Sequence, residues 1–297
     1  MNVPSAFVLG SASHTGRVRV NNEDDYLLGA LLPPVDELLL CAIADGMGGT
    51  AGGAEASRAA LRALGSTVLD GASPEPPERR LELGFRSAAE RVHEQAMAVP
   101  ALQEMGTTLT ALCLAPGRAV VGHIGDTRLY RVRAGEAEIL TNDHALREPD
   151  NVLTRCIGGG QSECEPDFDT FETRAGDRFL LLTDGVWGVL PAAEIGRLAG
   201  ASAPQTTAEA LVAAALRGGG PDNATAVVVD VVAPSPSAGV TELALARGER
   251  PDARASWPRP ASLRPPVWPW LALALALALA AVAGLRFWFG WDPWAFA

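Results

Sequence analysis

Cysteine is scarce in this sequence, and the few cysteines lack the spacing of a metal-binding pair. None of the four belongs to a CxxC motif. Cys41 and Cys113 lie inside apolar runs, where cysteine behaves as a small hydrophobic residue. The sequence therefore predicts no zinc site, and it is typical of a protein kept in a reducing compartment.

Positively charged residues are also few, and the first residues do not have the pattern of a signal peptide. It has 24 Lys and Arg against 35 Asp and Glu, a formal net charge of -11. This balance disfavours a nucleic-acid partner, because a phosphate backbone selects for clustered Lys and Arg. The first residues, MNVPSAFVLGSAS, have no basic segment followed by a long apolar one. We therefore expect no cleaved signal peptide and a cytoplasmic catalytic part.

The composition changes twice towards the C-terminal end. Residues 233–266 lose hydrophobic periodicity and are rich in Pro, Ala, Ser and Arg, which predicts a linker after a folded domain at 1–232. The run from Val267 to Leu285 has no charge, and as a helix it would be about 28 Å long, close to the hydrocarbon thickness of a bilayer. We predict one transmembrane helix at residues 267–289 and a short tail at 290–297. A buried core helix is the alternative.

The flanks of this run predict its orientation. Tryptophan and phenylalanine lie at both ends, as in the aromatic belts of membrane interfaces. Arg286 alone follows the run, whereas five arginines precede it: Arg247, Arg250, Arg254, Arg259 and Arg264. The positive-inside rule then places the Arg-rich side, with the folded domain, in the cytoplasm.

Short apolar runs bounded by Gly, Asp or Pro predict strands within residues 1–232. These runs lie at 7–12, 38–44, 107–114, 119–124, 129–132, 179–183 and 225–232. Helical periodicity clusters after residue 51 and after residue 193, and Thr206 with Glu209 forms a capping-box pattern in the second group. Because the helices do not alternate with the strands, the sequence favours antiparallel sheets covered by helices.

Four aspartates each stand beside a turn residue at the end of a predicted strand: Asp45, Asp126, Asp184 and Asp222. An isolated Asp-Gly pair is usually a β-turn, but four such sites closing apolar runs indicate a common cleft. Carboxylates with backbone carbonyls and no His or Cys are the ligands of hard cations such as Mg²⁺ or Mn²⁺. Glycine after Asp45 lets the main chain come close, so the Gly46 carbonyl could ligate the same ion.

Six motifs give the sequence a family resemblance. They are GRVRVNNED at residues 16–24, ADGMGG at 44–49, MGTT at 105–108, GDTR at 125–128, TDG at 183–185 and GGPDNAT at 219–225. In order and approximate spacing they resemble the bacterial type 2C protein phosphatases of the metal-dependent PPM family, over about residues 5–232. The resemblance implies an α+β fold, a four-layer α-β-β-α sandwich of two antiparallel sheets with a two-metal site at one end of the strands.

The resemblance also implies roles for individual residues. Asp45 would bridge two metals, Gly46 would contribute its carbonyl, and Asp184 with Asp222 would complete the shell of the first metal. Asp24 would lie near the metal-bound waters. A hydroxide held between two cations is a usable nucleophile at neutral pH, and the cations also neutralise the phosphate.

Two further roles follow from the same match. Asp126, with Asp184, corresponds to a third and weaker metal site, so we expect two or three Mn²⁺ or Mg²⁺ ions. Arg19 matches the phosphate-binding arginine of the family, and a guanidinium can grip two phosphate oxygens at once. The alternative for Arg19 is a solvated charge on the surface without a binding role, which is what we expect for Arg17.

The sequence departs from the family in two places. Met47 occupies the position where animal relatives have a histidine, the candidate proton donor to the leaving group, so water or an unidentified acid would have to donate the proton here. The stretch 144–155 is short where many bacterial relatives carry a flap, which makes flap-based substrate selection doubtful. The histidines show no metal-ligand spacing, and we expect structural or surface positions for His14, His93, His123 and His144.

These observations predict hydrolysis of phosphoserine and phosphothreonine on proteins, opposing a Ser/Thr kinase at the cytoplasmic face of the membrane. One alternative is a phosphatase of a partner-switching circuit that acts on anti-sigma-factor antagonists. Another is a membrane-bound scaffold that binds phosphoproteins without turnover. The full set of Asp45, Asp184, Asp222 and Arg19 argues against the scaffold, because a protein without activity has no need of all four.

Overall fold

The computed structural model describes residues 2–32, 37–146, 152–160, 164–200, 202–232 and 241–242. The predicted transmembrane segment 267–289 and the tail 290–297 lie outside the described residues, as does most of the predicted linker. Within the described ranges no helix is both long and apolar enough to cross a membrane. The chain divides into two compact units, residues 1–249 and 250–297, and the description below concerns the first.

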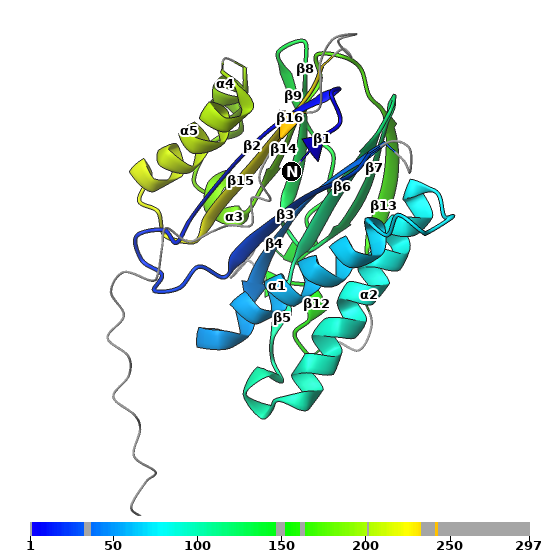
Figure 1. Ribbon diagram of the computed structural model, residues 1–297. Helices are drawn as coiled ribbons and strands as arrows, with labels where there is room; N and C mark the ends of the chain where they lie inside the picture. Colours follow the sequence, from blue (N-terminus) through cyan, green and yellow to red (C-terminus); the bar gives the residue numbers. More distant parts are fainter. Residues whose placement is uncertain are drawn as a thin grey trace, which may run out of the picture. The chain divides into compact units, whose positions relative to one another are not determined.

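Two antiparallel sheets form the centre of the first unit (Figure 1). The five-stranded sheet has the order β2 (Phe7–His14), β15 (Ala224–Val231), β14 (Arg178–Leu182), β8 (Arg128–Arg133) and β9 (Glu136–Ile139). In the seven-stranded sheet β4 (Leu38–Met47) is central and pairs with β3 (Asp24–Leu31), β6 (Leu109–Ala115) and β5 (Gly106–Thr107). The sheet continues through β7 (Arg118–Ile124) and β13 (Asp167–Glu172), and β12 (Ile157–Gly158) pairs with β5.

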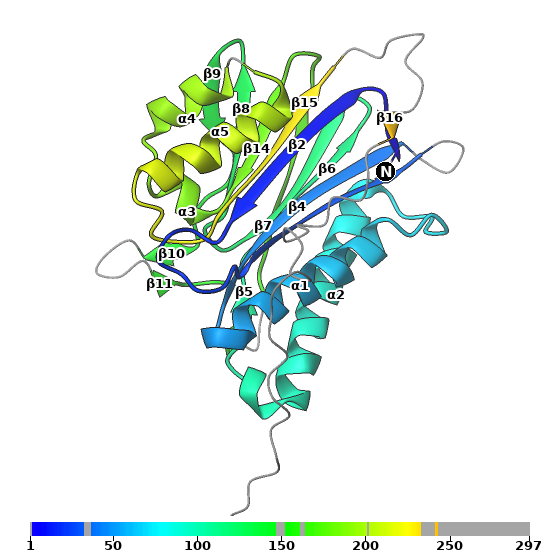
Figure 2. The same ribbon diagram turned by 60° about the vertical axis from the view of Figure 1, so that its left-hand side comes forward.

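Helices cover the outer face of each sheet (Figure 2). The pair α1 (Gly49–Val68) and α2 (Pro77–Ala98) packs on the seven-stranded sheet. The group α3 (Asp184–Trp187), α4 (Ala192–Ala199) and α5 (Pro204–Arg217) packs on the five-stranded sheet. The described part of the first unit is thus the predicted α-β-β-α sandwich.

The sequence of β4 shows why the sheets stack. Its side chains alternate between two cores: Leu38 and Leu40 pack under α1 and α2, whereas Leu39 and Cys41 face the other sheet. All four are fully buried. A strand covered on both faces reads as a continuous apolar run, and each fully buried leucine contributes roughly 2 kcal/mol.

All seven predicted strands are present, with shifts at their ends. Two long strands, β3 and β13, were not predicted. The structure also contains short elements: β1 (Asn2–Val3), β10 (Ala145–Leu146), β11 (Val152–Leu153), β16 (Thr241–Glu242) and the 3₁₀ turn η1 (Pro100–Leu102). The capping-box prediction is wrong. Proline at the first position starts α5 at Pro204, so Thr206 and Glu209 lie inside the helix and no side chain caps it.

Candidate metal centre

The five aspartates of the motifs lie near one another, at strand ends or in the adjoining turns. Asp45, near the end of β4, keeps a partly exposed surface and interacts electrostatically with the other four carboxylates. Loss of hydration, followed by repulsion from these carboxylates, raises the pKa of Asp45 well above its ordinary value. The arrangement concentrates negative charge that the described side chains balance poorly.

Asp24 lies beside Asp45 on the neighbouring strand, where the two residues are register partners. Its Oδ2 accepts hydrogen bonds from the hydroxyls of Thr183 (2.9 Å) and Thr225 (2.7 Å). Its Oδ1 is buried and has no hydrogen-bond partner among the described residues. Burial raises the pKa of Asp24 to about 7 in spite of the two hydroxyl donors. The side chain is therefore held firmly on one oxygen and unsatisfied on the other.

Asp184 and Asp222 come from the second sheet. Asp184 begins α3, two residues after the end of β14, and Asp222 lies two residues before β15. Burial, and then the charge of Asp222, raises the pKa of Asp184, although a hydrogen bond with the Asp45 carboxyl acts in the opposite direction. The Oδ1 of Asp184 is the second buried carboxylate oxygen of the group without a partner in the described structure.

Asp126 lies in the turn between β7 and β8, which belong to different sheets. Its side chain is buried. Burial, and then repulsion from Asp184 and Asp143, raises its pKa to about 7. Asp126 thus interacts with the group through Asp184, and its place in a further metal site stays a prediction.

Arg19 brings positive charge to this group from the loop between β2 and β3. Its guanidinium donates a hydrogen bond of 2.7 Å to Oδ2 of Asp222 and keeps half of its surface exposed. The pKa of Arg19 is raised, first by this hydrogen bond and also by the charges of Asp45 and Glu23. An exposed guanidinium beside the carboxylates is placed to meet an anionic ligand.

The main chain at Asp45 is held from both sides. Its carbonyl accepts hydrogen bonds from the Thr107 hydroxyl (2.9 Å) and the Thr108 N–H (2.9 Å), and its N–H donates to the Thr108 hydroxyl (2.9 Å). The next residue must be glycine, because a Cβ on Gly46 would lie 2.1 Å from the carbonyl oxygen of Gly53. The MGTT motif and the glycine together fix the backbone that carries the central carboxylate.

The residues present fit hard divalent cations. Their side-chain donors are all carboxylate oxygens, and two of these, in Asp24 and Asp184, are buried without a partner. Within the described ranges no group of three or more His, Cys, Asp or Glu side chains has the geometry to hold a metal ion by itself. The group therefore supplies charge and unsatisfied oxygens, while main-chain carbonyls and waters would have to complete the coordination.

Sequence reasoning missed three residues that support the centre: Thr183, Thr225 and Asn223. The threonines hold Asp24, as described above. Asn223 accepts a hydrogen bond from the N–H of Glu23 (2.8 Å) and donates to the carbonyls of Thr15 (2.8 Å) and Asn21 (2.9 Å), so it ties down both ends of the Arg19 loop. All three lie within the TDG or GGPDNAT motif, and Thr183 and Asn223 directly adjoin its aspartate, which was the available signal.

The histidines lie in the places expected of structural or surface residues. His123 and His144 are buried and hydrogen bonded, His93 is exposed, and His14 accepts a hydrogen bond from the N–H of Gly16. The Met47 methyl group lies close to Gly106 and Gly159.

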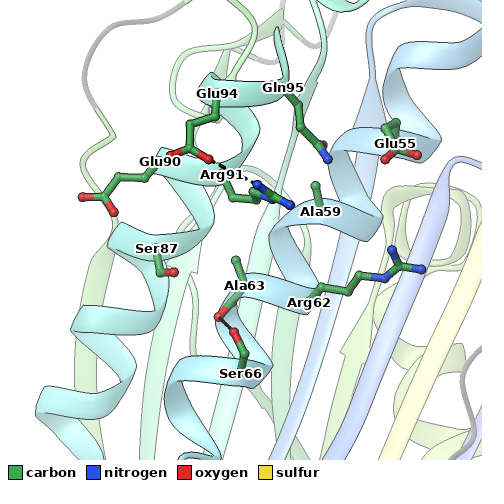
Figure 3. Close-up of a pocket in the computed structure, with 10 residues that line it drawn as sticks. All are labelled: Glu55, Ala59, Arg62, Ala63, Ser66, Ser87, Glu90, Arg91, Glu94 and Gln95. Carbon is green, nitrogen blue, oxygen red and sulfur yellow. Dashed lines mark hydrogen bonds and ion pairs between the residues drawn. The ribbon is translucent and has the colours of Figure 1, made fainter. Parts of the chain in front are cut away.

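Two hollows lie on the helical side, and none of the five motif aspartates lines either of them. One of about 460 Å³ lies between α1 and α2 and is lined by charged and small side chains such as Glu55, Arg62 and Glu94 (Figure 3). The other, of about 650 Å³, lies beside α2 against Cys164 and Phe168. The candidate metal centre is therefore separate from both.

Comparison with known proteins agrees with this geometry. The family described as Protein phosphatase 2C matches residues 16–216. Serine/threonine protein phosphatase PstP of Mycobacterium tuberculosis is 37% identical over 240 residues, 74% of this chain and 44% of that protein. Protein phosphatase PhpP of Streptococcus pneumoniae is 30% identical over 73% of this chain and 94% of its own length. The chain thus matches less than half of mycobacterial PstP.

Solved structures show the same relationship. The M. tuberculosis phosphatase PstP/Ppp has a TM-score of 0.69 at 33% identity, covering 76% of this chain and 99% of that structure. The catalytic domain of PstP in complex with two manganese ions has a TM-score of 0.68 at 36% identity, with the same coverage of both chains. The chain belongs to the protein phosphatase 2C family, and it is similar to the bacterial phosphatases PstP and PhpP.

Proposed function

We propose that this chain hydrolyses phosphoserine and phosphothreonine on proteins with two divalent cations, Mn²⁺ or Mg²⁺. The observation that carries the proposal is the group of aspartates with two unpartnered buried oxygens beside an exposed arginine. The proposed ligands are Asp45, the Gly46 carbonyl, Asp184 and Asp222. The PstP catalytic domain, whose structure is described with two manganese ions, supports this assignment.

The side chains divide the work of the proposed reaction. When bound, the two cations activate a water molecule and neutralise the phosphate. Arg19 turns its free donors to the phosphate oxygens, because a planar guanidinium can bind two of them at once. Asp24, fixed by two threonine hydroxyls, uses its remaining oxygen to orient water. With methionine at position 47, water is the proposed proton donor to the leaving group.

The test is phosphate release from a phosphothreonine peptide with Mn²⁺, with Mg²⁺ and with a chelator, for the chain and for Asp45→Asn. We expect metal-dependent turnover that the substitution reduces by several orders of magnitude. A matched unphosphorylated peptide serves as the binding control. Specific binding of the phosphopeptide without turnover under any metal condition would instead support the scaffold.

We further propose that the chain acts at the cytoplasmic face of a membrane, opposing a Ser/Thr kinase and its phosphoprotein substrates there. The support is the uncharged apolar run from Val267 to Leu285, with arginines on its domain side. Membrane fractionation of the chain and of a variant lacking 267–297 tests this. We expect only the variant to leave the membrane fraction, and equal release of both would contradict the anchor.

A further inference from the structure

Four consecutive residues after β9 bond to the chain around the β7–β8 turn, which carries Asp126. Three of them reach its flanks, in the pairs Thr141 with Leu129 (3.1 Å), Asn142 with His123 (3.0 Å) and Asp143 with Arg128 (2.7 and 2.9 Å). The fourth, His144, reaches the turn itself at Gly125. The segment 141–144 therefore holds the part of the chain that carries Asp126.

His144 binds both sides of the turn at Gly125. Its Nδ1 accepts a hydrogen bond from the Gly125 N–H (3.2 Å), and its main-chain N–H donates to the Gly125 carbonyl (2.7 Å). Its Nε2 donates to Oδ2 of Asp167 (2.9 Å), and Oδ1 of the same carboxylate accepts a hydrogen bond from the Arg155 guanidinium (2.9 Å). These bonds require the neutral ring with its proton on Nε2. Asp167 and Arg155 thus hold the ring in the orientation that serves Gly125.

Gly125 has little other freedom. Its φ is +109°, a conformation that other residues rarely adopt, and a Cβ there would lie 2.5 Å from the Thr108 side chain. Thr108 packs on one side of the turn, and His144 supplies the hydrogen bonds. Because Asp126 is the next residue, a rotation of the Gly125 peptide would swing its carboxylate relative to Asp184.

We propose that His144 is a positioning residue for Asp126. By fixing the Gly125 peptide, it aims the Asp126 carboxylate at the space shared with Asp184, where a further divalent cation would bind. Arg128 connects the chain beside Asp126 to the helix that carries Asp184. Its guanidinium lies 3.5 Å from the centre of the Trp187 ring, and Trp187 belongs to the short helix that Asp184 begins. This inference rests on the proposed function for its activity readout, but not for its binding readout.

Two substitutions separate positioning from packing. Asparagine carries an oxygen at the same bond distance from Cβ as Nδ1, so His144→Asn keeps the acceptor for Gly125 and loses the bond to Asp167. Glutamine reaches the Nε2 position, so His144→Gln keeps a donor to Asp167 and loses the acceptor. Each variant loses one hydrogen bond of a buried side chain, and a role in packing alone would affect both alike.

The experiment is calorimetric titration of the full chain and its variants with Mn²⁺, beside phosphopeptide kinetics and thermal unfolding. We expect His144→Gln to weaken the lowest-affinity Mn²⁺ site about tenfold and to lower kcat with KM unchanged, as Asp126→Asn should. His144→Asn should stay within about twofold of the unsubstituted chain. The proposal is overturned if His144→Gln binds Mn²⁺ at the lowest-affinity site as the unsubstituted chain does, or if both variants lose the same affinity there.

Failure of the proposed function gives a different pattern. A chain that binds Mn²⁺ and does not release phosphate refutes the phosphatase activity, and the Mn²⁺ affinities of the two variants still decide the role of His144. Should His144→Gln fail to fold, Asp167→Ala replaces it, because Asp167 is half exposed and its loss frees the ring. We then expect weaker binding at the lowest-affinity site, and unchanged binding overturns the proposal.

Discussion

Asp45 lowers the stability of the folded protein when no metal is bound. Loss of hydration and four neighbouring carboxylates raise its pKa well above the ordinary value. A neutral amide of the same shape would remove this repulsion at the centre of the group. We therefore expect Asp45→Asn without metal to be more stable than the unsubstituted chain, by about 1 kcal/mol in free energy of unfolding.

Urea unfolding with chelator measures the stability without metal, and unfolding with Mn²⁺ measures how much the bound metal stabilises the chain. The unsubstituted chain should gain stability from Mn²⁺ in proportion to its binding, whereas Asp45→Asn should gain little. A variant that is less stable than the unsubstituted chain in chelator, yet still stabilised by Mn²⁺, would show that Asp45 serves the fold and not the metal.

Asn223 is the residue on which the Arg19 loop depends most. Its amide makes three hydrogen bonds to the loop main chain, and the residue is only 5% exposed. We expect Asn223→Ala to cost about 2 kcal/mol of stability and to raise KM for a phosphopeptide, because Arg19 is no longer held beside the carboxylates. Urea unfolding and steady-state kinetics measure the two effects.

Asn22→Ala is the matched control for this substitution. Asn22 lies in the same loop and donates one hydrogen bond, to the hydroxyl of Ser13 (2.8 Å). Its loss should leave KM within about twofold of the unsubstituted value. An equal rise of KM in both variants would mean that the loop responds to any change and that Asn223 has no special role.

At the scale of elements, close approach of α5 to β2 depends on one glycine. A Cβ on Gly10 would lie 2.1 Å from the backbone nitrogen of Gln205, at the start of the helix. Gly10→Ala must push α5 away from the sheet, and we expect a loss of about 3 kcal/mol in free energy of unfolding. The five-stranded sheet then loses part of its helical cover.

Gly196→Ala provides a control of the opposite sign. Gly196 lies inside α4, and its nearest neighbour would be 3.6 Å from a new Cβ, an ordinary contact. Alanine there should stabilise the protein by about 0.5–1 kcal/mol. Parallel urea unfolding of both variants measures the pair, and destabilisation of the same size in each would refute the steric argument at Gly10.

The predictability of the elements follows from burial. β4 is covered on both faces, so its apolar run marks it clearly, whereas β13 is an exposed edge strand whose sequence, DFDTFE, has no apolar pattern. β3 begins with two acidic residues and contains a glycine, which hid its alternation. Sequence reasoning named the motif aspartates, but the position of Thr183 and Asn223 beside them did not reveal their role, because that role depends on contacts across more than 150 residues of chain.

At the scale of the whole molecule, the first unit should fold without the rest of the chain. β15 ends at Val231, and the N–H of Val232 donates to the Ala6 carbonyl (2.7 Å). Beyond it, the described β16 adds only two register pairs with β1, although it lies in the predicted linker. We expect residues 1–232 and 1–249 to melt within about 4 °C of each other.

A third truncation calibrates this comparison. Ending the chain at Ala226 removes most of β15, which lies between β2 and β14 in the five-stranded sheet. That variant should not show cooperative melting in scanning calorimetry. If residues 1–232 behave like 1–226 and unlike 1–249, the boundary at Val232 is wrong and the following residues belong to the folded domain.

The central claim is that the aspartates around Asp45 form a two-metal centre. Anomalous diffraction at the manganese absorption edge, from crystals of the chain grown with Mn²⁺, tests it most directly. We expect two strong peaks, both in contact with the Asp45 carboxylate and one of them also with Asp184 and Asp222, and we expect their loss in Asp45→Asn. Peaks elsewhere, or none at a Mn²⁺ concentration that supports phosphate release, would contradict it.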